Sequence, residues 1–338
     1  MITLLSLPTV VRKSGTISLL LLTLLIGVTG CGEDAPEGET EGVSATGQEN
    51  WDIAEGIGPV HVYDMTLNVA QVAEVEGNEM VSDIIGSGDI RMRLVDSNDA
   101  TNTWLAAMDF RMTGENAGVE MPVTNTKQRI RYILSKNGTV MDFAMRAGDP
   151  SLDKTLQRLL QSVTERQNAG NYFLRSTWRD REVGESWIET LADTIDVDSV
   201  AMEGSPLIGD FRMIFQIRTR YTYEGKIDTL GVEAIRIRSD IEEMAIDGSI
   251  TSEAVSLTIS SLGSGSYVTY FDAGAGIYLS TSGSQKLKST IKIPAMGLDM
   301  PMNQTITMSS TRIAMRDEIA DDPEENDEES ANDDAEEN

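Results

Sequence analysis

Apolar and polar residues alternate through most of residues 56 to 316, and an alternation of period two is typical of strands with one buried face. The clearest example runs from Phe211 to Ile217, and the same period recurs over residues 63–69, 90–94, 104–112, 141–145 and 287–293. Strands that are apolar on one side and polar on the other indicate an antiparallel sheet with one face in water. We therefore predict a mainly β fold with about ten strands.

Short glycine-rich or polar stretches predict the turns between these strands. The strongest signal is Asn137-Gly138, because this pair suits the tight turn of a β-hairpin. Turns are also predicted at Glu76-Gly77-Asn78, Gly86-Ser87-Gly88, Glu224-Gly225, Asp247-Gly248, Gly263-Ser264-Gly265-Ser266 and Asp272 to Gly276.

One segment has helical periodicity instead. Asp149 can cap a helix, Pro150 suits its first turn, and five apolar residues from Leu152 to Val163 follow at helical spacing. Asn168-Ala169-Gly170 would end it. A helix of about four turns cannot cover the apolar face of a large sheet, so the sheet must curve. We predict a large curved antiparallel sheet, or half-barrel, built from two meanders around this central amphipathic helix.

The first 30 residues have the features of an export signal. Arg12 and Lys13 precede an apolar run from Ile17 to Ile26, which is too short to span a bilayer as a helix. Val28-Thr29-Gly30-Cys31 then resembles the lipobox of bacterial lipoproteins, in which the Cys is acylated and becomes the mature N-terminus. Cys31 is the one Cys in the chain. The resemblance implies a membrane anchor on Cys31 in the cell envelope, with the outer membrane as the expected site.

Charge divides the rest of the chain into a core and two acidic ends. Residues 31–55 hold eight acidic residues and no basic ones, and residues 317–338 hold 13 Asp and Glu and no Lys or Arg. We predict a disordered tether and a disordered tail, because such segments bury too little apolar area to offset ordering entropy. Residues 56–316 are then a single β-rich domain in two halves, about 56–170 and 171–316.

Composition excludes several functions. The formal net charge is -28, which opposes binding to nucleic-acid phosphates. His61 is the one His of the chain, so no triad or histidine metal site can be assembled, and we assign it a structural or surface role. The sequence predicts neither an enzyme nor a metal or cofactor.

The apolar strand positions are the one indication of a ligand. Met occurs 17 times whereas aromatic residues make up 5% of the chain, and Met suits surfaces that accept varied apolar partners. Filling of the core by Met is the alternative interpretation. The candidate ligand face consists of Met92, Met108, Phe110, Met141, Phe143, Met213 and Phe215.

The whole arrangement resembles the half-barrel lipoproteins of the lipoprotein-carrier and lipid-transfer type. Within that group it is most similar to uncharacterised bacterial lipoproteins with a Val-Gly-x-Ser-Trp element, here Val183 to Trp187, and a late glycine-rich hairpin, here Gly265 to Gly283. The resemblance implies a curved sheet wrapped on helices and an apolar ligand, either a small molecule or lipid or a lipidated partner. The alternative is a ligand-free structural or interaction module displayed on a tether.

Overall fold

The computed structural model describes residues 51, 53–54, 56–75, 77–121, 123–147, 172–201, 208–251 and 256–316. Long strands dominate these ranges. The first six are β1 (Ile57–Val75), β2 (Asn78–Ser97), β3 (Thr101–Asn116), β4 (Val119–Glu120), β5 (Thr124–Ser135) and β6 (Val140–Ala147). The other six are β7 (Ser186–Ala201), β8 (Ile208–Thr229), β9 (Val232–Thr251), β10 (Ser256–Asp272), β11 (Tyr278–Ile293) and β12 (Leu298–Arg316). One helical turn, α4 (Ser176–Arg179), precedes β7, and a 3-10 turn, η2 (Pro294–Met296), precedes β12.

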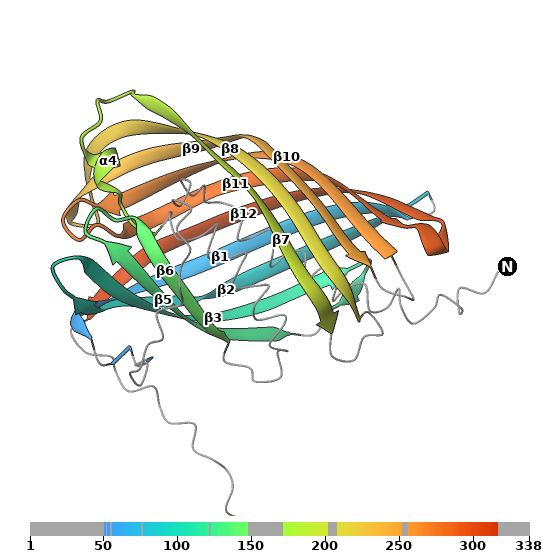
Figure 1. Ribbon diagram of the computed structural model, residues 1–338, viewed down its shortest axis with the longest axis horizontal. Coiled ribbons are helices and arrows are strands. Elements are labelled where there is room, and N and C mark those ends of the chain that lie inside the picture. Colours follow the sequence, from blue (N-terminus) through green and yellow to red (C-terminus); the bar gives the residue numbers. More distant parts are fainter. Residues whose placement is uncertain are drawn as a thin grey trace, which may run out of the picture.

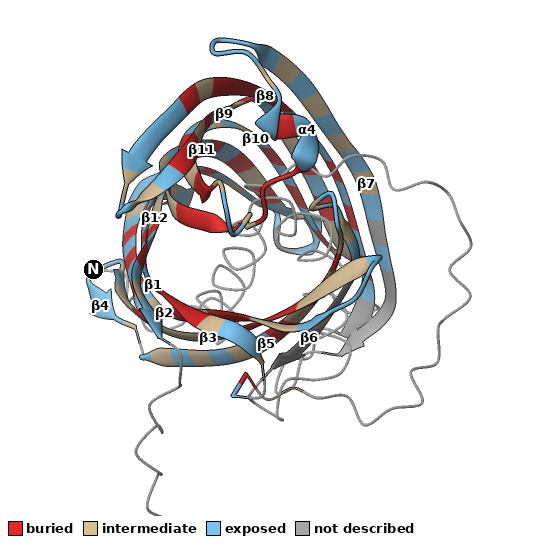
Figure 2. Ribbon diagram, turned by 90° about the vertical axis from the view of Figure 1, so that its left-hand side faces the viewer, coloured by how far each residue is buried: buried red, intermediate tan, exposed pale blue. Residues whose placement is uncertain are grey.

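All twelve strands belong to one antiparallel sheet, in the order β6-β5-β3-β2-β1-β12-β11-β10-β9-β8-β7, with β4 beside β3 (Figure 1). Two meanders therefore join where the first long strand pairs with the last, over the register from Val60↔Arg316 to Ala73↔Met302. The edges of the sheet are β6 and β7, which follow each other in the chain. Seen from one end, the sheet curves through most of a circle without closing (Figure 2). The predicted fold class is confirmed.

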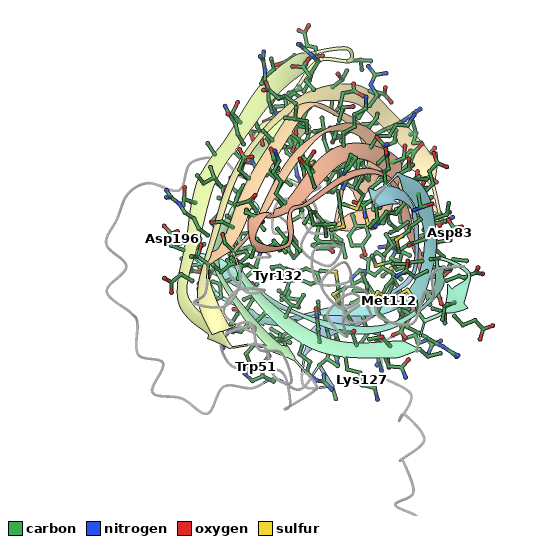
Figure 3. The ribbon with its side chains drawn as sticks, turned by 90° about the vertical axis from the view of Figure 1, so that its right-hand side faces the viewer. Trp51, Asp83, Met112, Lys127, Tyr132 and Asp196 are labelled. Atoms are coloured by element: carbon green, nitrogen blue, oxygen red, sulfur yellow. The ribbon has the colours of Figure 1, made fainter. Side chains whose placement is uncertain are left out.

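The two faces of the sheet differ as the alternation predicts. In β1, the odd-numbered residues from Tyr63 to Val69 are buried, whereas the even-numbered residues between them are exposed. Buried side chains from all the long strands whose burial is described join into one cluster on the concave face. The convex face carries ion pairs such as Arg220 to Glu242 at 2.6 Å. Figure 3 shows Met112 and Tyr132 on the inner side of the curve, with Asp83, Lys127 and Asp196 on the outer side.

Several predicted turns lie instead in the middle of strands. Gly86-Ser87-Gly88 is central to β2, and Gly263 to Ser266 is central to β10. A Cβ at Gly86 would lie 2.3 Å from Cζ of Phe110, and one at Gly88 would lie 2.1 Å from the Asp109 carbonyl oxygen. Glycine therefore provides room on the crowded concave face of a strongly curved sheet. The turns predicted at Glu224-Gly225 and Asp247-Gly248 are wrong in the same way, since both lie within strands.

The other predicted turns are confirmed. Gly77 separates β1 from β2, and Asn137-Gly138 separates β5 from β6, each with a glycine at positive φ. Between β10 and β11, Oδ1 of Asp272 accepts hydrogen bonds from the backbone N–H groups of Gly274 and Ala275, both at 2.9 Å. Here an Asp side chain fixes the turn that follows it.

The folded part begins earlier than the predicted boundary at residue 56. Ile53 is 4% exposed and packs with Leu105 and Ala107 on the convex face of β3. Arg93 holds this segment, because its guanidinium donates to the carbonyl oxygens of Ala54 at 2.6 Å and Gly58 at 2.9 Å. The last residues of the predicted tether are therefore part of the domain.

Other predictions fall on undescribed residues. The signal segment, Cys31, most of the tether, nearly all of the predicted helix from Asp149 to Gly170 and the acidic tail lie outside the described ranges. Within the described ranges, no helix is long and apolar enough to cross a membrane.

Candidate functional site

The concave face holds most of the predicted ligand residues. Met92, Met213 and Phe215 are almost fully buried, at 1%, 4% and 1% exposure. Met108 and Phe110 are only partly buried and pack against the same cluster. The alternation in the sequence therefore assigned these five side chains to one face, and the curvature of the sheet brings them together.

Strand β6 departs from the prediction. The register shifts between Ile133 and Leu134, so that Leu134 pairs with Val140 and Ile133 with Asp142. Met141 is the extra residue of this bulge and is 63% exposed, while Val140 packs against the buried cluster in its place. The assignment of Met141 to the ligand face is wrong, because a bulge interrupts the period of two. Phe143 pairs with Tyr132, but its side chain is not among those that the structure describes.

One end of the concave face is covered by residues 172–179, which we call the crossing segment. Its backbone ties together two distant turns: the Leu174 N–H donates to the Gly276 carbonyl and the Ser176 N–H to the Asn137 carbonyl, both at 2.8 Å. A Cβ at Gly138 would lie 2.5 Å from the Leu174 carbonyl oxygen, so this turn requires glycine for the close approach as well as for its positive φ. Figure 1 shows α4, the end of the crossing segment, at this end of the sheet.

Aromatic rings fill the space beneath the crossing segment. Phe173 and Trp178, which are 1% and 2% exposed, point into the sheet. Phe173 meets Tyr132 edge to face with 5.3 Å between ring centroids, and Trp178 lies 5.2 Å from Tyr221. Rings in such tilted contacts add stabilisation beyond the apolar area that they bury. This end of the half-barrel, the aromatic end, is a packed core rather than an entrance.

A buried polar group of three side chains lies at the aromatic end. The Arg312 guanidinium nitrogen Nη1 is 3.2 Å from Oδ2 of Asp272 and 3.3 Å from Nδ1 of His61. His61 is 3% exposed. Burial, helped by the positive charge of Arg312, lowers the pKa of His61 from 6.5 to about 4. His61 is therefore neutral at pH 7, with Nδ1 as acceptor for Arg312.

A second buried ion pair connects the crossing segment to β7. Arg175 donates to Oε2 of Glu189 at 3.3 Å, and Nε1 of Trp187 donates to Oε1 of the same carboxylate at 3.0 Å. The Arg175 guanidinium also lies 5.1 Å from the ring centre of Trp178. Trp187 closes the Val183 to Trp187 element, so this element serves to dock the crossing segment on the start of β7.

A group of uncharged polar side chains interrupts the apolar surface of the concave face. The register places Gln304 on β12 directly opposite Gln71 on β1, and Gln71 opposite Ser82 on β2. Gln304 is 4% exposed, and its Oε1 has no hydrogen-bond partner among the described residues. On the neighbouring strands, Ser261 and Ser289 share a hydrogen bond of 2.7 Å.

The chemistry of these groups is limited. Within the described residues, no three His, Cys, Asp or Glu side chains are placed to hold a metal ion. The carboxylates of Asp272 and Glu189 each face an arginine, and neither lies beside a nucleophile in the contacts given above. The arrangement can bind an apolar group and hydrogen-bond a polar one.

Sequence reasoning did not find the buried polar groups. Asp272 was assigned to a turn, and nothing local in the sequence indicates that it meets Arg312. The one signal available was a charged residue at an inward position of a strand, since the even-numbered residues from Met302 to Arg312 share one face.

No protein-family model and no curated protein matches the sequence. Solved structures similar to this chain include OccK2 (OpdF) of Pseudomonas aeruginosa, with 8% identity, a TM-score of 0.30, and coverage of 75% of this chain and 98% of that chain. OpdQ of the same organism has 7% identity, a TM-score of 0.25, and coverage of 75% and 99%. The translocator domain of autotransporter NalP from Neisseria meningitidis has 7% identity, a TM-score of 0.20, and coverage of 76% and 89%. Likeness at these TM-scores carries no function over to this chain.

Proposed function

We propose that this protein is a non-enzymatic lipoprotein of the bacterial cell envelope that binds an apolar molecule or a lipidated partner on its concave face. The observation that carries the proposal is the partial exposure of Met108, Phe110 and Met308 in the middle of that face. Apolar side chains left partly open inside a curved sheet suit a ligand that is shielded from water. The ion pairs of the convex face are compatible with a domain held in an aqueous compartment.

The anchor in this proposal is an acylated Cys31. Each buried methylene of an acyl chain contributes about 0.8 kcal/mol, so two or three chains hold a protein stably at a bilayer. The 20 residues from Cys31 to Asn50 extend over at most about 70 Å. Such a tether would let the domain reach ligands away from the membrane surface. This holds whichever leaflet carries the anchor, because the domain lies in the compartment next to that leaflet.

Native mass spectrometry tests the ligand. We expect lipid to co-purify with the full chain carrying Cys31→Ser and to be lost when Met108→Lys adds a charge on the concave face. The matched control is Ile85→Lys, at a residue that is 58% exposed. Binding of the apolar fluorophore N-phenyl-1-naphthylamine should follow the same pattern.

The second candidate function is a ligand-free interaction module on a tether, and the closed aromatic end favours it. A monomer that carries no lipid and does not bind the fluorophore at micromolar concentration would replace the ligand proposal with this one.

A further inference from the structure

The buried charges of the domain bear on which ligand the concave face accepts. Of the buried cations in the described ranges, Arg312 faces Asp272, and Arg175 faces Glu189. The remaining one, Arg93, donates to backbone carbonyls of the segment on the convex side. The register with Phe215 places one more carboxylate, that of Asp193, on the concave side. A carboxylate or phosphate bound on the concave face would therefore have no unpaired partner in Arg312 or Arg175, because each already faces a carboxylate.

The uncharged polar group around Gln304 offers a different kind of contact. Oε1 of Gln304 is buried without a donor, and an unsatisfied buried acceptor costs free energy that a ligand can recover. Gln71 lies opposite on β1, and the apolar residues Met302 and Ile306 precede and follow on the same face. A polar atom bound here would have apolar surface on both sides along the strand.

We propose that the ligand is an uncharged amphiphile, a long hydrocarbon chain with a hydroxyl group, and that the hydroxyl donates a hydrogen bond to Oε1 of Gln304. This inference rests on the proposed function and names the ligand class of that site. A hydroxyl fits because it can donate to the amide oxygen and can also accept from an amide N–H. The hydrocarbon chain would lie against Phe110, Met108 and Met308.

Three probes with the same 18-carbon unsaturated chain separate the alternatives: oleyl alcohol, methyl oleate and oleate at pH 8. The experiment is displacement of N-phenyl-1-naphthylamine from the full chain carrying Cys31→Ser. We expect oleyl alcohol to bind about tenfold more tightly than methyl oleate, which has no donor, and more tightly than oleate, which is charged.

Gln304→Leu should abolish the preference for the alcohol over the ester, because it removes the acceptor and leaves an apolar surface. Leu is compatible with folding here because the buried amide oxygen that it replaces has no hydrogen-bond partner among the described residues. The matched control is Asn303→Leu, which makes the same kind of change at the exposed neighbouring residue and should keep the preference. Thermal unfolding of both variants reports on their folding.

The outcomes distinguish the two levels of the proposal. Equal affinity for all three probes, tighter binding of oleate, or an unchanged preference in a folded Gln304→Leu variant overturns the inference but leaves an apolar site. Failure of the fluorophore itself to bind overturns the proposed function. If Gln304→Leu does not fold, the three probes still test the inference on the protein that keeps Gln304, because their relative affinities can be measured without a variant at this position.

Discussion

Replacing His61 with Asn should remove an acid-sensitive part of the protein's stability. His61 is buried beside Arg312, and its pKa falls from 6.5 to about 4 on folding. Between pH 6.5 and about pH 4, His61 is therefore mostly protonated in the unfolded chain and mostly neutral in the folded chain. The free energy of unfolding contributed by this residue is fully present above pH 6.5 and declines as the pH falls toward 4.

The magnitude follows from the size of the shift. One pKa unit corresponds to about 1.4 kcal/mol, so a fall from 6.5 to about 4 predicts a loss of about 3 kcal/mol by pH 4. Asn suits the comparison because its side-chain oxygen can accept from Arg312 at the place of Nδ1 and does not titrate. Protonation of the 55 acidic residues affects both proteins and cancels in their difference.

The assay is urea unfolding of both proteins at several pH values from 7.5 to 4, followed by Trp fluorescence. The difference in unfolding free energy between the unsubstituted protein and His61→Asn should shift by about 3 kcal/mol in favour of the variant as the pH falls. Because the chain has one His, no other imidazole contributes. A difference that stays constant across this range would refute the burial of a neutral His61 beside Arg312.

Three further changes have defined outcomes. Cys31→Ser should leave the signal unprocessed by the lipoprotein pathway and abolish incorporation of labelled acyl chains, and a wild-type protein that is soluble and unlabelled would disprove the anchor. Deleting residues 317–338 should shift the melting temperature by less than about 5 °C, since the acidic tail is expected to bury little apolar area, and calorimetry checks this. Gly88→Ala should cost about 1–3 kcal/mol in denaturant unfolding, because the added Cβ would meet the Asp109 carbonyl at 2.1 Å, whereas Ser87→Ala on the exposed side should change little.

The faces of the sheet could be predicted because a period of two assigns each residue to a side without reference to its partners. Phe211 to Ile217 shows this in β8, where the odd-numbered residues are buried. The glycines could not be assigned in the same way. Gly86-Ser87-Gly88 has the composition of a turn, and only the register that places Phe110 beside Gly88 distinguishes a crowded strand from a turn.

The buried polar groups could not be predicted because their members are distant in the chain. His61 and Arg312 are 251 residues apart and meet because β1 pairs with β12. The bulge that exposes Met141 depends on how β5 and β6 align, which no pattern within β6 reveals. Each of these features is a property of strand pairing, and strand pairing between distant segments is not encoded in local periodicity.

The strand order also determines how the two meanders are held together. The seam between them is the pairing of β1 with β12, and at the aromatic end the crossing segment adds a second connection, from Asn137 in one meander to Gly276 in the other. His61 of β1 and Arg312 of β12 flank the seam at this same end. The polar group around Gln304 and Gln71 lies farther along the seam, where β1 and β12 still pair but the crossing segment makes no contact described above. One end of the concave face is thus tied across by backbone hydrogen bonds and filled by aromatic rings, whereas the uncharged acceptor of the proposed ligand site lies toward the other end.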